Sequence, residues 1–176
     1  MRLVIDTDVA QASGEELAVH PTAKRCGDFL RAVRRICHQV VMTKGIYSEW
    51  ERHSSGFATR WLRSMFAQKK VIAIDADPDQ DLRHRIERFG GGDKDREAMM
   101  KDLILIQAAL KTDRTVVSLD KRARELFAGL ARHADNLNDV VWVNPVIESE
   151  KPIGWLEAGA KPEEQRMLGF LSEGGN

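Results

Sequence analysis

The feature that most constrains the fold is a nearly continuous apolar stretch over residues 98–110 that carries one acid, Asp102. The stretch is too long for a single strand and too apolar for a solvent-facing helix, so it predicts a helix buried on almost all sides. An ionised carboxylate inside such a helix is costly unless a lysine, an arginine or a metal ion compensates it. A short buried strand is expected next, over 115–119, and Asp120 falls at its carboxyl end. In open parallel sheets this edge is where ligands bind, so two acids converging on it need an explanation.

Short apolar runs recur along the chain and alternate with helical stretches. The runs predicted as strands cover residues 3–5, 39–43, 71–74, 115–119 and 140–143. The first is apolar on both faces, which is typical of a central parallel strand. Strands that alternate with helices predict a mostly parallel sheet with helices on both faces. We therefore expect a single three-layer α/β domain with a central, mostly parallel sheet of four to five strands.

Proline and glycine indicate where the helices end. The stretch 14–36 is predicted as two helices because Pro21 splits it. A strongly charged helix is expected over 79–89. The three glycines at 90–92 that follow it give the backbone freedom to move, so they predict a mobile loop.

Composition limits the classes of function. The chain has 176 residues, of which 43% are hydrophobic and 31% charged, as expected for one soluble globular domain. Lys+Arg and Asp+Glu number 27 each, so any contact with nucleic acid would need a local basic patch. Cys26 and Cys37 lack paired spacing, which is typical of reduced residues in a cytosolic protein. Without a signal peptide or an apolar run near the roughly 20 residues that span a bilayer, we expect a cytoplasmic protein with no membrane partner.

The acidic residues that could carry chemistry occupy the same kind of place in the predicted fold. Asp6 and Asp8 follow the first strand, Glu49 follows the second, Asp102 lies on the buried helix, and Asp120 ends the fourth strand. Hard divalent cations such as Mg²⁺ take oxygen ligands, usually a few carboxylates with waters and substrate phosphate. Two such ions about 4 Å apart could activate water and neutralise charge on a phosphodiester. Acids without basic partners nearby in the sequence therefore predict a metal site.

These residues, in their order and spacing, resemble the PIN domain. The matching segments are Leu3 to Asp8, Glu49, Lys101 to Leu110 and Val116 to Asp120, so the resemblance covers about residues 1–145. The family supplies toxin ribonucleases of toxin–antitoxin pairs (VapC-like) and other metal-dependent nucleases that cleave RNA. Residues 146–176 lie outside it and form a C-terminal extension, which would pack on the core, act as a partner-binding arm or be partly disordered.

The resemblance implies a metal-dependent endoribonuclease that acts on RNA. Its catalytic acids would be Asp6, Glu49, Asp102 and Asp120, which would also bind Mg²⁺ or Mn²⁺. Ser118 would support the last acid through its hydroxyl. Asp8 stands where family members often carry Asn or Ser, so it is either an additional ligand or a turn residue. An antitoxin-like protein and a second copy of the chain are the protein partners that the resemblance suggests.

Each site residue also has a structural alternative. Asp6, Asp8 and Asp120 could cap the helices that follow them. Glu49 could be a solvated helix residue with Glu51 in its role, and Asp102 could pair with a buried arginine.

An RNA-binding patch and other functions are further alternatives. Arg31, Arg34 and Arg35 are the first candidates to bind RNA phosphates, although they also fit a solvated helix face. A phosphatase of the haloacid-dehalogenase type would use Asp6 and Asp8, but it needs a second acid where Lys121 follows Asp120. A non-catalytic PIN-like scaffold or partner-binding module is the alternative that is not an enzyme.

Overall fold

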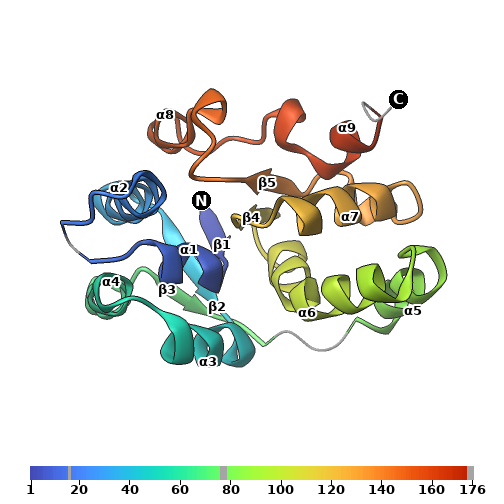
Figure 1. The fold of residues 1–176 in the computed structure, drawn as a ribbon, viewed down its shortest axis with the longest axis horizontal. Helices are drawn as coiled ribbons and strands as arrows, with labels where there is room; N and C mark the ends of the chain where they lie inside the picture. The colour runs from blue at the N-terminus through green and yellow to red at the C-terminus, as the bar shows by residue number, and fades with distance from the viewer. Residues whose placement is uncertain (16, 76–78, 174–176) are drawn as a thin grey trace.

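A five-stranded parallel sheet lies at the centre of the computed structural model, which describes residues 1–15, 17–75 and 79–173 (Figure 1). The strands are β1 (Arg2–Ile5), β2 (Gln39–Met42), β3 (Val71–Ala73), β4 (Thr115–Val117) and β5 (Val141–Val143). Their order is β3-β2-β1-β4-β5, and each neighbouring pair is parallel. β1 is therefore the middle strand, and the predicted α/β fold is confirmed.

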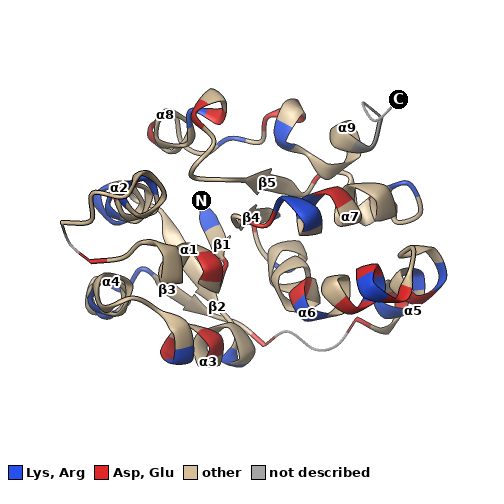
Figure 2. Cartoon of the chain, viewed as in Figure 1, with Lys and Arg blue, Asp and Glu red and all other residues tan. Residues whose placement is uncertain are grey.

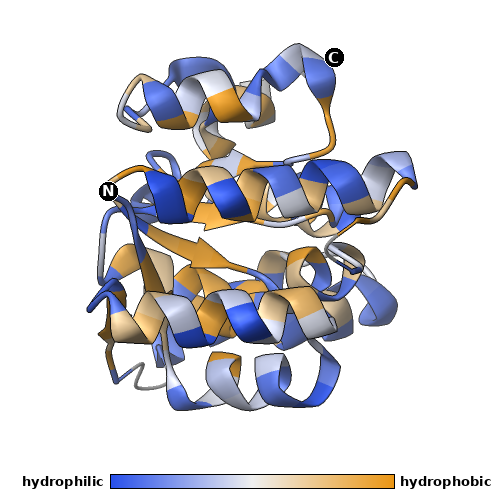
Figure 3. Cartoon of the chain, turned by 90° about the vertical axis from the view of Figure 1, so that its left-hand side faces the viewer, coloured by the Kyte–Doolittle hydropathy of each residue, from blue (hydrophilic) through white to orange (hydrophobic). Residues whose placement is uncertain are grey.

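Helices flank both faces of this sheet and make the fold three-layered (Figures 1 and 3). They are α1 (Thr7–Ala12), α2 (Pro21–Arg35), α3 (Lys44–His53), α4 (Gly56–Ala67), α5 (Gln80–Phe89), α6 (Asp93–Leu110), α7 (Lys121–Ala131), α8 (Pro152–Glu157) and α9 (Leu168–Glu173). Three short 3₁₀ turns join them: η1 (Asp135–Leu137), η2 (Glu148–Glu150) and η3 (Glu164–Arg166). Among the described residues, no helix is both long and apolar enough to cross a membrane.

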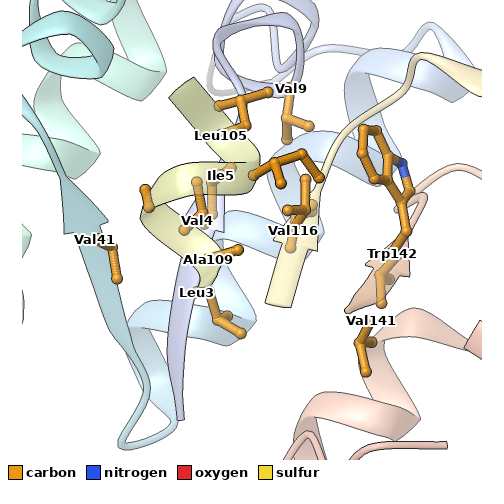
Figure 4. Packing of buried hydrophobic residues seen from close by; sticks show 14 of the residues in the cluster. Leu3, Val4, Ile5, Val9, Val41, Leu105, Ala109, Val116, Val141 and Trp142 are labelled. Carbon is orange, nitrogen blue, oxygen red and sulfur yellow. The ribbon is translucent and has the colours of Figure 1, made fainter. Parts of the chain in front are cut away.

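The helix that was predicted to be buried is α6, and it packs on β1 and β4. Figure 4 shows Leu105 and Ala109 of α6 against the side chains of β1. Both residues are buried, and Leu3 and Ile5 on β1 are fully so. Burying a leucine or isoleucine side chain contributes about 1.5–3 kcal/mol, so this contact fixes where α6 lies relative to the strand ends. That position sets the place of Asp102.

The region between β1 and α2 differs from the prediction of two helices over 14–36. Only one helix lies there, α2, and Pro21 is its first residue, where the missing N–H of proline leaves no helical bond unmade. The other helix, α1, begins directly after β1, earlier than predicted. It ends before Gly14, whose φ of +63° is a left-handed conformation that stops a helix. Apart from residue 16, which lies outside the described residues, the segment 14–20 is not helical.

The extension after residue 145 packs against the rest of the domain as far as residue 173. α8 packs against α2, and α9 packs against α7. Met167 forms an antiparallel bridge with Val141, and the N–H of Leu168 donates to the carbonyl of Val140 at 2.9 Å. The extension therefore covers the outer edge of β5.

Candidate active site

The strand register brings the first and last predicted acids to one edge of the sheet. Ile5 on β1 pairs with Val117 on β4, so the residues that follow these two strands lie at the same level. The N–H of Asp6 donates to the carbonyl of Val117 at 2.9 Å and continues the pairing. Figure 2 shows acidic segments at the start of α1, at the start of α7 and on α6, gathered around the centre of the view.

Ser118 is the buried residue that links these acids. Its Oγ lies 2.9 Å from Oδ2 of Asp6 and 2.9 Å from Oδ2 of Asp8, and it accepts the N–H of Asp120 at 3.0 Å. A hydroxyl has one proton, so it cannot donate fully to both carboxylates at once. Ser118 was predicted to support the last acid only, and in the structure it also holds the two acids that follow β1.

The carboxylate of Asp8 accepts more hydrogen bonds than its role as a turn residue would require. Its Oδ2 also accepts the backbone N–H of Leu119 at 2.8 Å. Its other oxygen, Oδ1, is buried and has no hydrogen-bond partner among the described residues. A buried carboxylate oxygen without a partner is costly, and a cation or a proton would satisfy it.

Burial, and to a smaller extent repulsion between carboxylates, raises the pKa values of Asp6, Asp8 and Asp102. Burial, followed by the charge of Asp6, raises the pKa of Asp8 from 3.8 to about 7. Burial raises the pKa of Asp102 to about 7 as well, with smaller contributions from the charges of Asp6 and Asp120. Burial also raises the pKa of Asp6, which the hydrogen bond from Ser118 opposes, and the charge of Asp120 makes a smaller upward contribution. Carboxylates from three segments therefore share one electrostatic field.

No described cation neutralises this group by a direct ion pair. None of the ion pairs among residues 1–15, 17–75 and 79–173 includes Asp6, Asp8, Asp102 or Asp120. The alternative in which Asp102 pairs with a buried arginine is therefore not seen in the described part of the chain. Lys101, beside it in the sequence, lowers the pKa of Asp102 only as a minor influence.

The side chains of Asp120 and Asp6 differ in whether they cap the helix that follows them. Asp120 is exposed, and its Oδ1 accepts the N–H of Ala123 at 2.9 Å, so it caps α7 as the structural alternative proposed. Asp6 occupies the N-cap position of α1, but its side chain makes no capping bond and accepts from Ser118 instead. Capping therefore explains the Asp120 side chain in part and the Asp6 side chain not at all.

Glu49 lies on a helix beside these acids but is engaged elsewhere. Its Oε1 lies 2.5 Å from Nη2 of Arg52, its Oε2 lies 3.5 Å from Nε2 of His53, and its side chain is 48% exposed. α3 packs against α1 and α6, and the indole N–H of Trp50 donates to the carbonyl of Ile5 at 3.0 Å. The backbone of α3 is thus held close to the end of β1. The carboxylate of Glu49 is solvated, as expected if Glu49 is an ordinary residue on a helix surface.

The three arginines proposed to bind RNA lie on α2. This helix leads into β2, so Arg34 and Arg35 lie at the amino edge of the sheet, opposite the acids. Arg35 pairs with Glu157 at 2.7 Å. Arg31 pairs with Asp28 at 2.9 Å and lies over the ring of Phe57. A phosphate bound by Arg34 or Arg35 would not be the one next to the acids.

Two residues near the acids were not singled out by sequence reasoning. Arg122, two positions after Asp120, pairs with Asp95 of α6 at 2.7 Å. This pairing raises the pKa of Arg122, and the charge of Asp120 makes a smaller contribution. Asn144 is buried at the end of β5, where its side-chain amide donates to the carbonyl of Leu119 at 3.1 Å. A polar residue directly after a predicted strand was the available signal for Asn144.

The described side chains could hold a cation only if waters or substrate supplied most of its ligands. Among the described residues, no three His, Cys, Asp or Glu side chains are placed to hold one metal ion together. Mg²⁺, however, usually binds one or two carboxylates and completes its shell with waters and substrate phosphate. The all-oxygen donor set, the unpartnered Oδ1 of Asp8 and the excess negative charge all suit a hard cation.

No protein-family model matches the chain, and no characterised protein matches its sequence.

Proposed function

We propose that the chain is an endoribonuclease that depends on Mg²⁺ or Mn²⁺ and hydrolyses RNA phosphodiesters. The observation that carries the proposal is the group of Asp6, Asp8, Asp102 and Asp120 at the carboxyl edge of the sheet, whose charges act on one another without a neutralising ion pair among the described residues. The resemblance to the PIN domain supports the choice of RNA. It adds the expectation that an antitoxin-like protein holds the activity in check.

The side chains would divide the work according to their surroundings. Asp6, Asp8 and Asp102 are partly buried and would hold the cation, while the exposed Asp120 would face the substrate. Ser118 keeps the carboxylates of Asp6 and Asp8 in place. A bound divalent cation would supply an activated water and neutralise charge on the phosphodiester. Because Ser118 holds the carboxylates of Asp6 and Asp8, and the N–H of Leu119 also donates to Asp8, these two side chains need little rearrangement to bind a cation.

Neither alternative function accounts for this arrangement. A haloacid-dehalogenase-type phosphatase would need a free Asp8 and a free Thr43 hydroxyl, but Asp8 is bonded to Ser118 and Leu119, and Thr43 caps α3. It would also leave Asp102 without a role. A scaffold would gain nothing from buried acids that repel one another, because such groups destabilise a fold rather than support it.

The test is cleavage of a labelled RNA by the pure protein with Mg²⁺ or Mn²⁺. Asp120→Asn should lower turnover at least about 100-fold and leave RNA binding intact, as expected for a group that acts in the chemical step. Asparagine caps a helix as well as aspartate does, so this variant keeps α7 in place. Glu97→Gln, which removes an exposed acid from α6, is the matched control.

A companion experiment concerns the metal. Titration calorimetry should show Mn²⁺ binding to the wild-type protein and much weaker binding to Asp102→Asn. Glu49→Gln and Glu51→Gln, compared in the same cleavage assay, would show which of the two glutamates takes part. Absence of RNA cleavage with either ion, together with unchanged Mn²⁺ binding in Asp102→Asn, would refute the proposal.

A further inference from the structure

A second cluster of polar and aromatic side chains lies away from the acids, on α5 and in the turn after α7. The rings of Phe89 and His133 stack with centroids 4.1 Å apart and planes at 9°. The guanidinium of Arg88 lies over the Phe89 ring, 5.1 Å from its centroid. Phe89 is 39% exposed and His133 is exposed as well. A flat aromatic pair with a cation beside it therefore faces solvent.

This stack is held in place by backbone contacts. Arg85 donates from Nη1 to the carbonyl of His133, and its Nε lies 2.7 Å from Oδ2 of Asp81. The N–H of His133 donates to the carbonyl of Leu130 at 2.8 Å, which continues from the end of α7. The rings are thus fixed relative to two helices, so a ligand that stacks on them would find the surface already formed.

The charges around the stack favour an anionic ligand. The rings border a depression of about 360 Å³ lined by Asp81, His84, Arg85, Arg88, Phe89 and His133. Asp81 is the one acid in this lining, and it pairs with Arg85. Within the described residues, Arg88 forms no ion pair and is free to meet a phosphate. An acidic peptide could also use Arg88, but it would make no use of the flat ring surface.

The location connects this surface with the acids. α5 packs against α6, which carries Asp102, and against α7, which begins after Asp120. His133 lies beyond the far end of α7, whose 11 residues begin after Asp120, and at 1.5 Å per residue such a helix spans roughly 16 Å. A few nucleotides of an extended strand would cover that distance.

We propose that the His133–Phe89 stack binds an unpaired base of single-stranded RNA and that Arg88 binds a phosphate next to it. The identity of the ligand as RNA rests on the proposed function, whereas the ring and cation surface stands independently of it. Base-on-aromatic stacking tolerates different sequences, because every base has a flat face. The surface would therefore position RNA of varied sequence with its backbone extending toward the acids.

The experiment measures binding separately from cleavage. The full chain in EDTA is titrated into a fluorescently labelled single-stranded RNA of about ten nucleotides, so that any metal-dependent cleavage is suppressed. His133→Ala should weaken binding by between about fivefold and 150-fold, the usual contribution of one stacked base. His133→Phe keeps a flat ring and should bind within about threefold of wild type. Urea unfolding of each variant checks that the domain is intact.

The arginine is tested through the salt dependence of binding. Arg88→Gln should weaken binding and reduce the slope of log affinity against log salt by about 0.7, the value for one phosphate of a single strand. Arg63→Gln, at an exposed position of α4, a helix that packs on α1 and α2, is the matched control and should bind as wild type does. A fully paired RNA duplex should show no loss with His133→Ala, because its bases are not available to stack.

The outcomes separate this inference from the proposed function. Wild-type affinity in both His133→Ala and Arg88→Gln would overturn the inference even if the protein cleaves RNA. Equal losses in His133→Ala and His133→Phe, or an equal loss for duplex RNA, would overturn it too, because the ring would then act only through the local structure. Selective loss in His133→Ala without any cleavage by wild-type protein would support the inference while the proposed function fails.

Discussion

Ionisation of Asp102 should destabilise the metal-free protein as the pH rises, and Asp102→Asn tests this directly. The pKa of this carboxyl rises from 3.8 to about 7, mainly because it is buried and also because Asp6 and Asp120 repel its charge. The folded protein therefore binds this proton about a thousandfold more tightly than the unfolded chain does. A tenfold difference corresponds to about 1.4 kcal/mol, so full ionisation lowers the free energy of unfolding by at most about 4 kcal/mol, and solvent screening of the partly exposed carboxylate reduces this figure.

The sign follows from the direction of the change in pKa. Because the pKa is higher in the folded state, the stabilising contribution of the bound proton is complete below about pH 4. It decreases as the pH rises and is lost once the pH passes about 7, the folded-state value. The amide of asparagine cannot ionise, so Asp102→Asn should gain stability relative to wild type over this range, by up to about 4 kcal/mol.

The assay is urea unfolding in EDTA at a series of values between about pH 4.5 and 8.5. Glu97→Gln, on the same helix, removes one exposed charge and should stay within about 0.5 kcal/mol of wild type. At about pH 8, Mg²⁺ or Mn²⁺ at 100 times its dissociation constant should raise the stability of wild type by about 2.7 kcal/mol and that of Asp102→Asn much less. A loss of stability in Asp102→Asn that is equal at low and high pH would refute the reasoning, because it would indicate that the carboxylate is a structural acceptor.

Three further predictions concern single side chains. Ser118→Ala should lower the free energy of unfolding by about 1–3 kcal/mol, because two carboxylates lose their shared donor, and unchanged urea unfolding would contradict this. Glu150→Gln should lower it by about 3 kcal/mol, because two largely buried arginines lose their common partner, whereas Glu163→Gln at the rim should have a much smaller effect in the same assay. Burial raises the pKa of the Cys26 thiol to about 12, so iodoacetamide at about pH 8 should label the exposed Cys37 and spare Cys26. Equal labelling by mass spectrometry would contradict the last prediction.

The strands could be predicted from the sequence because each is a short apolar run between helical stretches. Parallel strands place their carboxyl ends at one edge, and this rule alone put Asp6 and Asp120 near each other. The rule could not show that Ser118 bonds to both acids after β1, since that contact joins positions more than 100 residues apart. It also could not show that Phe89 stacks on His133, because these residues belong to separate segments of the chain, at the end of α5 and after α7.

Two features of the structure had local signals in the sequence. Arg52 and His53 stand three and four positions after Glu49, the spacing at which side chains meet on a helix surface, so its ion pairs were visible in the sequence. The start of α1 was signalled by Asp6, a residue type that commonly precedes a helix, with a second acid in the first turn.

The extension after residue 145 covers an edge of the sheet that would otherwise be open. β5 is an edge strand, and an uncovered edge exposes unpaired backbone groups that invite association with other chains. The extension covers it with the bridge from Met167 to Val141, and it buries Leu168 and Trp155 against the domain. Glu150 holds the extension in place through ion pairs with Arg124 of α7 and Arg166 of η3. Since Asp120 caps the start of α7, the extension also supports the helix that places this acid of the candidate active site.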